Sequence, residues 1–312
     1  MNKYIVLSVL LIVSVAFGVI LGYTQLFPVT DETLPILLNF RIPRVLFALL
    51  NGVALSLAGL VYQIILRNPM ADGFTTGAAS SAAFGGCLAL ILWGAPHIVA
   101  ISAFLSALIS AVIVWRLAKR SDNITVILAG ITISVIASSG VSFLKYFYDD
   151  AINTMVFWLM GSVANAGWNE IAIMGVLAAT VLVGLFTSKD KIAVLFLDDE
   201  SAATSGVDVY KLRLALFVIT TFLVAISVSF CGTIGFIGLM VPHAVRMLFG
   251  HTIREQLVCS AMLGGLVLVV LDIISRTVLS SGAELPIGVI TSFCGGLFFA
   301  LLLLKRGGRV WS

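Results

Sequence analysis

The sequence predicts an all-α polytopic membrane protein with ten transmembrane helices. Hydrophobic residues make up 60% of the 312 residues and charged residues 11%, whereas soluble domains carry about 25% charged residues. The chain divides into apolar runs, most of them close to the roughly 20 residues that a helix needs to cross the hydrocarbon core. A soluble fold could not bury so much apolar surface, so we expect the chain to lie in lipid.

The spans follow one another with short connections, and residues 1–312 are predicted to form a single transmembrane domain. The first run follows Lys3 and is interpreted as a retained span rather than a signal peptide, because it is long and no small-x-small cleavage site follows it. The predicted spans are approximately 4–24, 45–66, 74–93, 97–116, 123–145, 170–187, 213–231, 233–249, 257–279 and 286–304.

Two stretches have an ambiguous number of crossings. Residues 214–245 contain no charged side chain and are interpreted as two spans that reverse near Cys231-Gly232, whereas 151–169 only dips into the outer surface. With this count both termini are cytosolic, and every lysine and arginine except Arg41, Arg44, Lys145 and Arg276 falls inside. This agrees with the excess of basic residues in cytosolic loops.

Composition and motifs exclude several functions. A net charge of +3 is too small to indicate nucleic-acid binding, and no Gly-Lys dipeptide is present, so the chain has no phosphate-binding loop. The three histidines are scattered, and Cys87, Cys231, Cys259 and Cys294 lack the spacing of a metal site and are interpreted as small buried hydrophobic residues. We therefore predict no catalytic site, no metal site and no cofactor bound by this chain.

The segment FRIPR at 40–44 places two arginines beside a proline at the outer mouth of the second span. Basic residues are disfavoured on that face, so Arg41 and Arg44 indicate either contacts with lipid phosphates or a docking surface for an acidic external partner. Arg276, near the outer end of the ninth span, could complete the same patch. Arg276 is also one helical turn from Asp272, an intramembrane carboxylate whose expected role is an ion pair with it.

The segment DDESAATSGV at 198–207 has acidic residues, then small residues, then a glycine, which is typical of a short helix. Its small face could accept a groove of another protein, although a free surface helix has the same pattern. The residues concerned are Asp199, Glu200, Ala202, Ala203, Gly206 and Val207.

The segment GTIGFIGLMVPHAVR at 232–246 combines closely spaced glycines with a proline inside a short span. A proline frees a backbone carbonyl and kinks a membrane helix, so we expect close packing or bending here. Pro242, His243 and Arg246 are placed at the cytosolic turn that follows.

At these residues the sequence resembles the FecCD family, the permease subunits of ATP-driven importers for ferric siderophores, haem and cobalamin. The resemblance runs in family order through RIPR (41–44), NGVALSLAG (51–59), QIILRNPMADG (63–73), ESAATSGV (200–207), CGTIGFIGLMVPHAVRMLFG (231–250) and ELPIGVITSFCGGLFFALLL (284–303).

The resemblance implies a type II ABC importer permease fold, with a second permease copy or paralogue as partner and the substrate path between the two. It implies that an external substrate-binding protein docks on Arg41, Arg44 and Arg276, and that two ATPase subunits, which carry ATP-Mg, dock on a cytosolic coupling segment at 196–212. The expected location is the prokaryotic plasma (inner) membrane.

The leading hypothesis is an import permease for an iron–siderophore complex, with haem or cobalamin as alternative cargo. An ion-coupled secondary carrier is a remote alternative, because Asp272 alone resembles a coupling carboxylate. Several serines are either path-lining groups or ordinary helix-packing residues, namely Ser80, Ser81, Ser134, Ser138 and Ser139.

Overall fold

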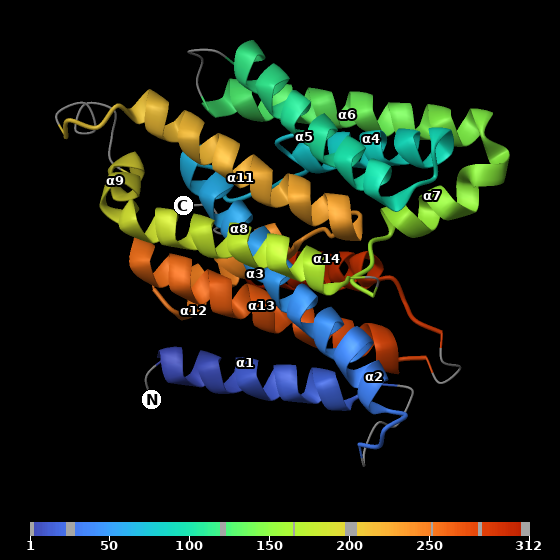
Figure 1. Ribbon diagram of the computed structural model, residues 1–312. Coiled ribbons are helices and arrows are strands. Elements are labelled where there is room, and N and C mark those ends of the chain that lie inside the picture. The colour runs from blue at the N-terminus through green and yellow to red at the C-terminus, as the bar shows by residue number, and fades with distance from the viewer. Residues whose placement is uncertain are drawn as a thin grey trace.

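The computed structural model describes residues 3–22, 29–118, 123–164, 166–196, 205–250, 252–279 and 283–306. Within these ranges the chain is helical and contains no strand. Figure 1 shows long helices that run roughly alongside one another, with α3 crossing the middle of the bundle. Eight described helices are long and apolar enough to cross a membrane, and α4 and α12 are shorter apolar helices.

The helices of the first half begin with α1 (Lys3–Ile20), followed by α2 (Leu34–Ile36), the π-helical turn η1 (Leu37–Arg41) and α3 (Ile42–Ile65). They continue with α4 (Ala78–Leu92), α5 (Pro96–Leu117) and α6 (Asn123–Phe147). The short η2 (Asp149–Ala151) and α7 (Ile152–Leu159) then turn back at the surface.

The helices of the second half are α8 (Trp168–Thr187), α9 (Lys189–Ala193) and η3 (Val194–Phe196), then α11 (Val209–Cys231) and α12 (Ile237–Leu248). The last two are α13 (Ile253–Thr277) and α14 (Ile287–Arg306). The reversal between α11 and α12 falls at Gly232, as the sequence predicted, and Gly232 has a positive φ of 68° that suits a glycine.

Each predicted span overlaps one of these helices, although several helix ends differ from the predicted bounds by a few residues. Residues 34–65 form one continuous helical segment of 32 residues, which begins before the predicted start of the second span at residue 45. Pro43 does not break it, because it lies at the start of α3 directly after the π-helical turn. The predicted span 233–249 is shorter, because residues 232–235 are extended before α12 begins.

Helix α3 forms the core of the bundle and packs against α13, α11, α12 and α8. Small residues allow the close approach, since a Cβ built on Gly52 would lie 2.2 Å from the Gly264 carbonyl oxygen of α13. Ser56 Oγ donates to the Ser260 carbonyl across the same interface at 2.8 Å. Without a hydrophobic driving force in lipid, such close contacts associate the helices.

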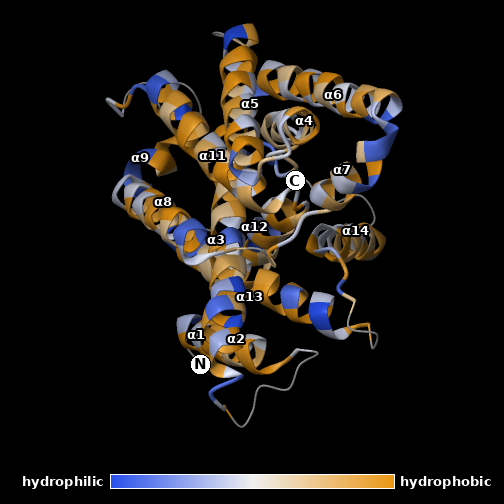
Figure 2. Cartoon of the chain, turned by 45° about the vertical axis from the view of Figure 1, so that its right-hand side comes forward, coloured by the Kyte–Doolittle hydropathy of each residue, from blue (hydrophilic) through white to orange (hydrophobic). Residues whose placement is uncertain are grey.

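Helix α4 has only 15 residues yet lies within the bundle, between α5, α6 and α11. A short helix is tolerated at this depth because neighbouring protein, rather than lipid, surrounds its ends. Helix α6, in contrast, packs mainly on α4 and α5 and leaves a wide face open. In Figure 2 apolar residues dominate the helices, as expected of a membrane bundle.

Hydrogen bonds join the helix ends at one end of the bundle. Arg67, after α3, donates to the Leu195 carbonyl in η3, and Trp115, near the end of α5, donates to Tyr210 at the start of α11. Lys3 of α1 pairs with Glu255 of α13. These contacts place the start of α1, α11 and α13 and the end of α3 and α5 at the same end of the bundle. We name it the Arg246 end and the opposite one the Arg44 end.

Candidate functional site

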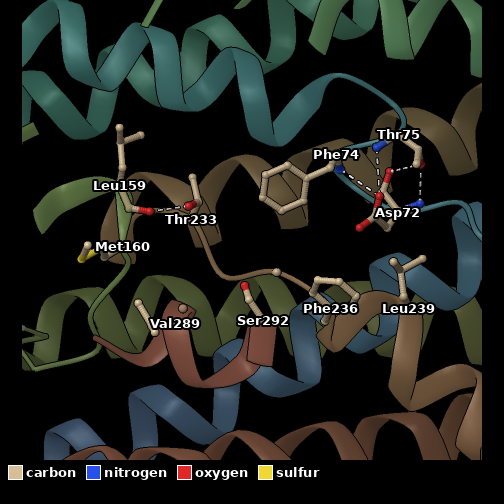
Figure 3. Close-up of a pocket in the computed structure, with 12 residues that line it drawn as sticks. Asp72, Phe74, Thr75, Leu159, Met160, Thr233, Phe236, Leu239, Val289 and Ser292 are labelled. Carbon is tan, nitrogen blue, oxygen red and sulfur yellow. Dashed lines mark hydrogen bonds between the residues drawn. The ribbon is translucent and has the colours of Figure 1, made fainter. Parts of the chain in front are cut away.

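The structure contains a cavity of about 650 Å³ that is lined by segments far apart in the sequence. It lies between the 72–75 turn, the end of α7, the 233–236 segment and the start of α14, as Figure 3 shows. We call it the central cavity. Its wall is Asp72, Phe74, Thr75, Leu159, Met160, Thr233, Gly235, Phe236, Leu239, Gly288, Val289 and Ser292.

Hydrogen bonds to two backbone carbonyls at the end of α7 hold the wall of the central cavity in place. Thr233 Oγ1 donates to the Leu159 carbonyl at 2.5 Å, and the Gly288 N–H donates to the Met160 carbonyl at 3.0 Å. These bonds join the end of α7 to the reversal before α12 and to the first turn of α14. Three segments far apart in sequence thereby meet at one opening.

Phe236 lies at the start of α12 and forms part of the inner wall. Its φ of 66° is a left-handed conformation that is unusual for a phenylalanine. The side chain fits beside α14 only because residue 295 is glycine, where an added Cβ would lie 2.2 Å from the Phe236 Cβ. The aromatic side chain of a residue with a strained backbone conformation therefore lies between the cavity and α14.

A groove along α6 continues the central cavity, because both include Phe74 and Thr75. This groove has a volume of about 440 Å³ and is lined on α6 by Ile131, Ser134, Val135, Ser138, Ser139 and Ser142. The hydroxyls follow helical spacing, so one stripe of an otherwise lipid-compatible helix is polar. Polar groups at membrane depth usually face protein or a water-filled passage.

The serines proposed from the sequence divide between two environments. Ser134, Ser138 and Ser139 line the α6 groove, whereas Ser80 and Ser81 on α4 are each 7% exposed and do not line it. Ser142, which the sequence analysis did not select, belongs to the groove. Its place one turn after Ser138 on the same helix was the available signal.

At the Arg44 end, two arginines hold the carboxylate of Asp272, and Arg41 lies nearby. Arg44 Nε lies 2.9 Å from Asp272 Oδ1 and Arg276 Nη2 lies 2.9 Å from Asp272 Oδ2. Arg44 Nη1 also lies 2.8 Å from Glu284 Oε2, in the segment that leads into α14. Asp272 is fully buried, and we call Arg41, Arg44, Asp272, Arg276 and Glu284 the arginine cluster.

Arg41 and Arg276 close the end of α1. Arg41 Nη1 donates to the Leu21 carbonyl at 2.8 Å, and Arg276 Nη2 donates to the Gly18 carbonyl at 3.0 Å. The last carbonyls of a helix lack partners within it and carry partial negative charge, so guanidinium groups stabilise them. Arg41 is 9% and Arg276 5% exposed, so both point into the bundle. Docking of a partner on these arginines stays a prediction. Within the arginine cluster, Arg44 and Glu284 are the residues nearest the surface.

At the Arg246 end, Pro242 lies inside α12 and not at a turn, in contrast to the sequence expectation. Pro242 has no N–H for the Gly238 carbonyl four residues earlier. Gln63 Nε2 of α3 donates to this carbonyl at 3.1 Å, and Gln63 Oε1 accepts from Arg246 Nη2 at 2.5 Å. Because Pro242 cannot donate to it, the Gly238 carbonyl is free to accept from Gln63, and this hydrogen bond connects α12 to α3.

His243 also lies inside α12 rather than at a turn. It is 7% exposed, and its ring packs edge-on against Phe298 and Phe299 of α14 at 6.1 and 5.9 Å. Among the described residues no group of three His, Cys, Asp or Glu side chains could hold a metal ion. Cys87, Cys231 and Cys259 are buried free thiols and Cys294 is partly buried.

Residues 197–204 of the predicted coupling segment lie outside the described residues, and they include Asp199, Glu200, Ala202 and Ala203. Gly206 is described and has a φ of 73° with open space around the position of a Cβ. Val207 follows it, and the Asp208 carboxylate caps α11 by accepting from the Lys211 N–H at 3.0 Å. This bond holds the pKa of Asp208 below its usual value.

An ion pair between α1 and α13 completes the Arg246 end. Lys3 Nζ donates to a Glu255 carboxylate oxygen and, at 2.7 Å, to the Phe249 carbonyl. Together with the arginine cluster, this pair fixes α1 at its two ends, since the helix has few buried residues of its own.

The fold is that of known transporters. Over 97% of this chain and 98% of the other, it matches the inward-facing structure of a transporter assigned to the metal-chelate type of ABC transporter, with a TM-score of 0.91 and 30% identity. PsaBC from Streptococcus pneumoniae, solved with a Fab, matches 84% of this chain and 90% of the other with a TM-score of 0.59 and 16% identity, which shows the fold alone.

Relatives with differing cargo names are similarly close in sequence. The hemin transport permease HmuU of Yersinia pestis is 34% identical over 88% of this chain and 85% of its own length. The cobalamin import permease BtuC of Halobacterium salinarum is 34% identical, with coverages of 91% and 77%. The molybdate import permease MolB of Haemophilus influenzae is 32% identical, with coverages of 88% and 82%.

Fold and relatives together define a multi-pass membrane permease subunit of an ABC importer, with the all-α type II permease fold expected from the sequence. The chain belongs to the FecCD transport family, whose family model matches residues 5–305.

Proposed function

We propose that this permease subunit provides the path by which a metal chelate, specifically a ferric siderophore complex, is imported. The observation that supports this is the central cavity and its continuation along the α6 groove. The groove presents a stripe of hydroxyls at the surface of the bundle, where a partner subunit could close it. Haem or cobalamin remains the alternative cargo, since permeases named for each are 34% identical to this chain.

The proposed assembly contains a second permease copy or paralogue, two ATPase subunits and an external substrate-binding protein. ATP-Mg would bind to the ATPase subunits, so this chain would need no cofactor of its own. The protein would lie in the prokaryotic plasma (inner) membrane with the Arg246 end and both termini in the cytosol. The basic residues gathered at that end support this orientation.

A secondary carrier is a weaker alternative. Such a carrier needs a carboxylate near the midplane that gains and loses an ion. Asp272 is held between two arginines, so its charge is already compensated, which supports a structural role for it.

The test is import by proteoliposomes that contain this permease with its ATPase and binding protein. Uptake of a ⁵⁵Fe-labelled hydroxamate chelate should require ATP and the binding protein and should stop with vanadate. Haem and cobalamin, each with a matching binding protein, are compared in parallel. Uptake by this chain alone that does not respond to ATP would contradict the proposal and favour the carrier.

A further inference from the structure

Asp72 is a carboxylate that the sequence placed in a loop and the structure places inside the bundle. It is 6% exposed and borders a small void together with Leu55, Ala58 and Gly59 of α3. Gly59 precedes the end of α3 by six residues, or about 9 Å of helix at 1.5 Å per residue. The 66–77 connection therefore folds back and carries Asp72 into the wall of the central cavity, as Figure 3 shows.

Only one oxygen of this carboxylate has a structural role. Asp72 Oδ1 accepts from the N–H groups of Phe74 at 3.0 Å and Thr75 at 2.9 Å, and Thr75 Oγ1 accepts from the Asp72 N–H at 2.7 Å. These bonds form a turn that an asparagine could form equally well. Asp72 Oδ2 makes no hydrogen bond within the described part of the chain, so the turn does not explain the charge.

No cation compensates Asp72 within the described part of the chain. It takes part in none of the ion pairs found there. The described walls of the central cavity and of the α6 groove contain no lysine, arginine or histidine. A buried charge without a partner is costly, and a cationic or hydrogen-bond-donating group that enters the cavity would offset that cost.

We propose that Asp72 Oδ2 contacts the cargo in the central cavity and makes the path selective for chelates with a cationic or hydrogen-bond-donating surface over anionic ones. This rests on the proposed function and adds a charge preference to it. The rest of the wall supplies apolar groups and the hydroxyls of Thr75, Thr233 and Ser292, which suit a bulky neutral body. A carboxylate attracts positive and donor groups and repels an oxyanion such as molybdate.

The test compares binding of three ⁵⁵Fe-labelled ferric hydroxamate chelates of similar size, with net charges of +1, 0 and −1. Binding is measured on the complete permease–ATPase complex without the binding protein, so that the selectivity of that protein does not enter. The wild type should bind the cationic chelate about tenfold more tightly than the anionic one. Asp72→Asn keeps the acceptor for Phe74 and Thr75 and should bring this ratio close to one.

The matched control is Asp190→Asn, which removes one negative charge from an exposed side chain of α9 and should keep the wild-type ratio. A ratio unchanged by Asp72→Asn, or a wild-type preference for the anionic chelate, would overturn the proposal. ATP-driven uptake of the neutral chelate by the same wild-type complex is measured separately. Its absence would reject the proposed function, whereas its presence with an unchanged ratio would reject only the role of Asp72.

Discussion

The buried charge of Asp272 is compensated by neighbouring arginines. Asp272 is held by Arg44 and Arg276, and Arg276 also donates to the end of α1. The ion pair of Asp272 with Arg276 follows from their spacing of four along a helix. The participation of Arg44 does not, because Arg44 is 228 positions from Asp272 and meets it only in the folded chain, and Glu284 joins the cluster through Arg44.

Removing the shared carboxylate should destabilise the protein. In Asp272→Asn the guanidinium groups of Arg44 and Arg276 remain close to each other and lose their buried counter-ion, which costs about 3 kcal/mol. Thermal unfolding of the purified protein in detergent measures this as a clearly lower midpoint. Asp190→Asn, at a side chain that is 88% exposed, should change the free energy of unfolding by no more than about 0.5 kcal/mol. Its midpoint should therefore stay close to that of the wild type. Equal midpoints for both variants would show that the cluster does not stabilise the fold.

Glu284 gives a sharper test of docking than the arginines, two of which are buried. If an acidic side chain of the external binding protein pairs with Arg44, it competes with Glu284 for Nη1. Glu284→Gln should therefore tighten docking severalfold, as measured by surface plasmon resonance with the binding protein. Glu32→Gln removes a charge from another exposed residue and should have less effect. Weaker docking of Glu284→Gln would argue against the outer patch.

At the scale of helices, apolar length and charge predicted segments that each overlap a described helix, whose lengths nevertheless range from 12 residues in α12 to 25 in α13. The ends were less predictable. The segment 34–65 begins earlier than expected because Pro43 is tolerated near the start of α3. The return of the 66–77 connection into the bundle was not visible in the sequence, because polar residues such as Asp72 normally indicate a surface loop.

The interface of α3 with α13 should depend on the absence of a side chain at Gly52. In Gly52→Leu the side chain would collide with the backbone of Gly264, and backbone cannot move aside easily. We expect a loss of folded protein, seen as aggregation in size-exclusion chromatography. Gly184→Leu on α8 is the matched control, since nothing lies within 4 Å of a Cβ there. A monodisperse Gly52→Leu protein would contradict the packing described.

At the scale of the whole molecule, the proposed path would open through movement transmitted from partner ATPase subunits. Family resemblance identified the class of protein, and the coupling segment that it implies stays a prediction. The central cavity, in contrast, is formed by four segments that meet only in three dimensions. The groove lined by the α6 serines was partly predictable from the spacing of these residues. That the groove continues into the central cavity at Phe74 and Thr75 was not predictable.

Gly206 tests the transmission of movement. Its φ of 73° disfavours a branched side chain, although space is available. Gly206→Val should distort the exit of the proposed coupling segment and reduce ATP-driven uptake at least tenfold while the ATPase subunits still hydrolyse ATP. Gly206→Asn, which tolerates this conformation better, should retain more uptake. Equal uptake by the valine variant and the wild type would count against a coupling role.

The central claim is that cargo passes along the α6 groove. Its most direct test is uptake by Ser138→Cys proteoliposomes before and after treatment with a bulky, water-soluble thiol reagent. Ile136→Cys, at a side chain that is 62% exposed outside the groove, is the control on the same helix. The account predicts that labelled Ser138→Cys loses ATP-driven uptake while treated Ile136→Cys keeps it. Full labelling of Ser138→Cys with undiminished uptake would contradict it.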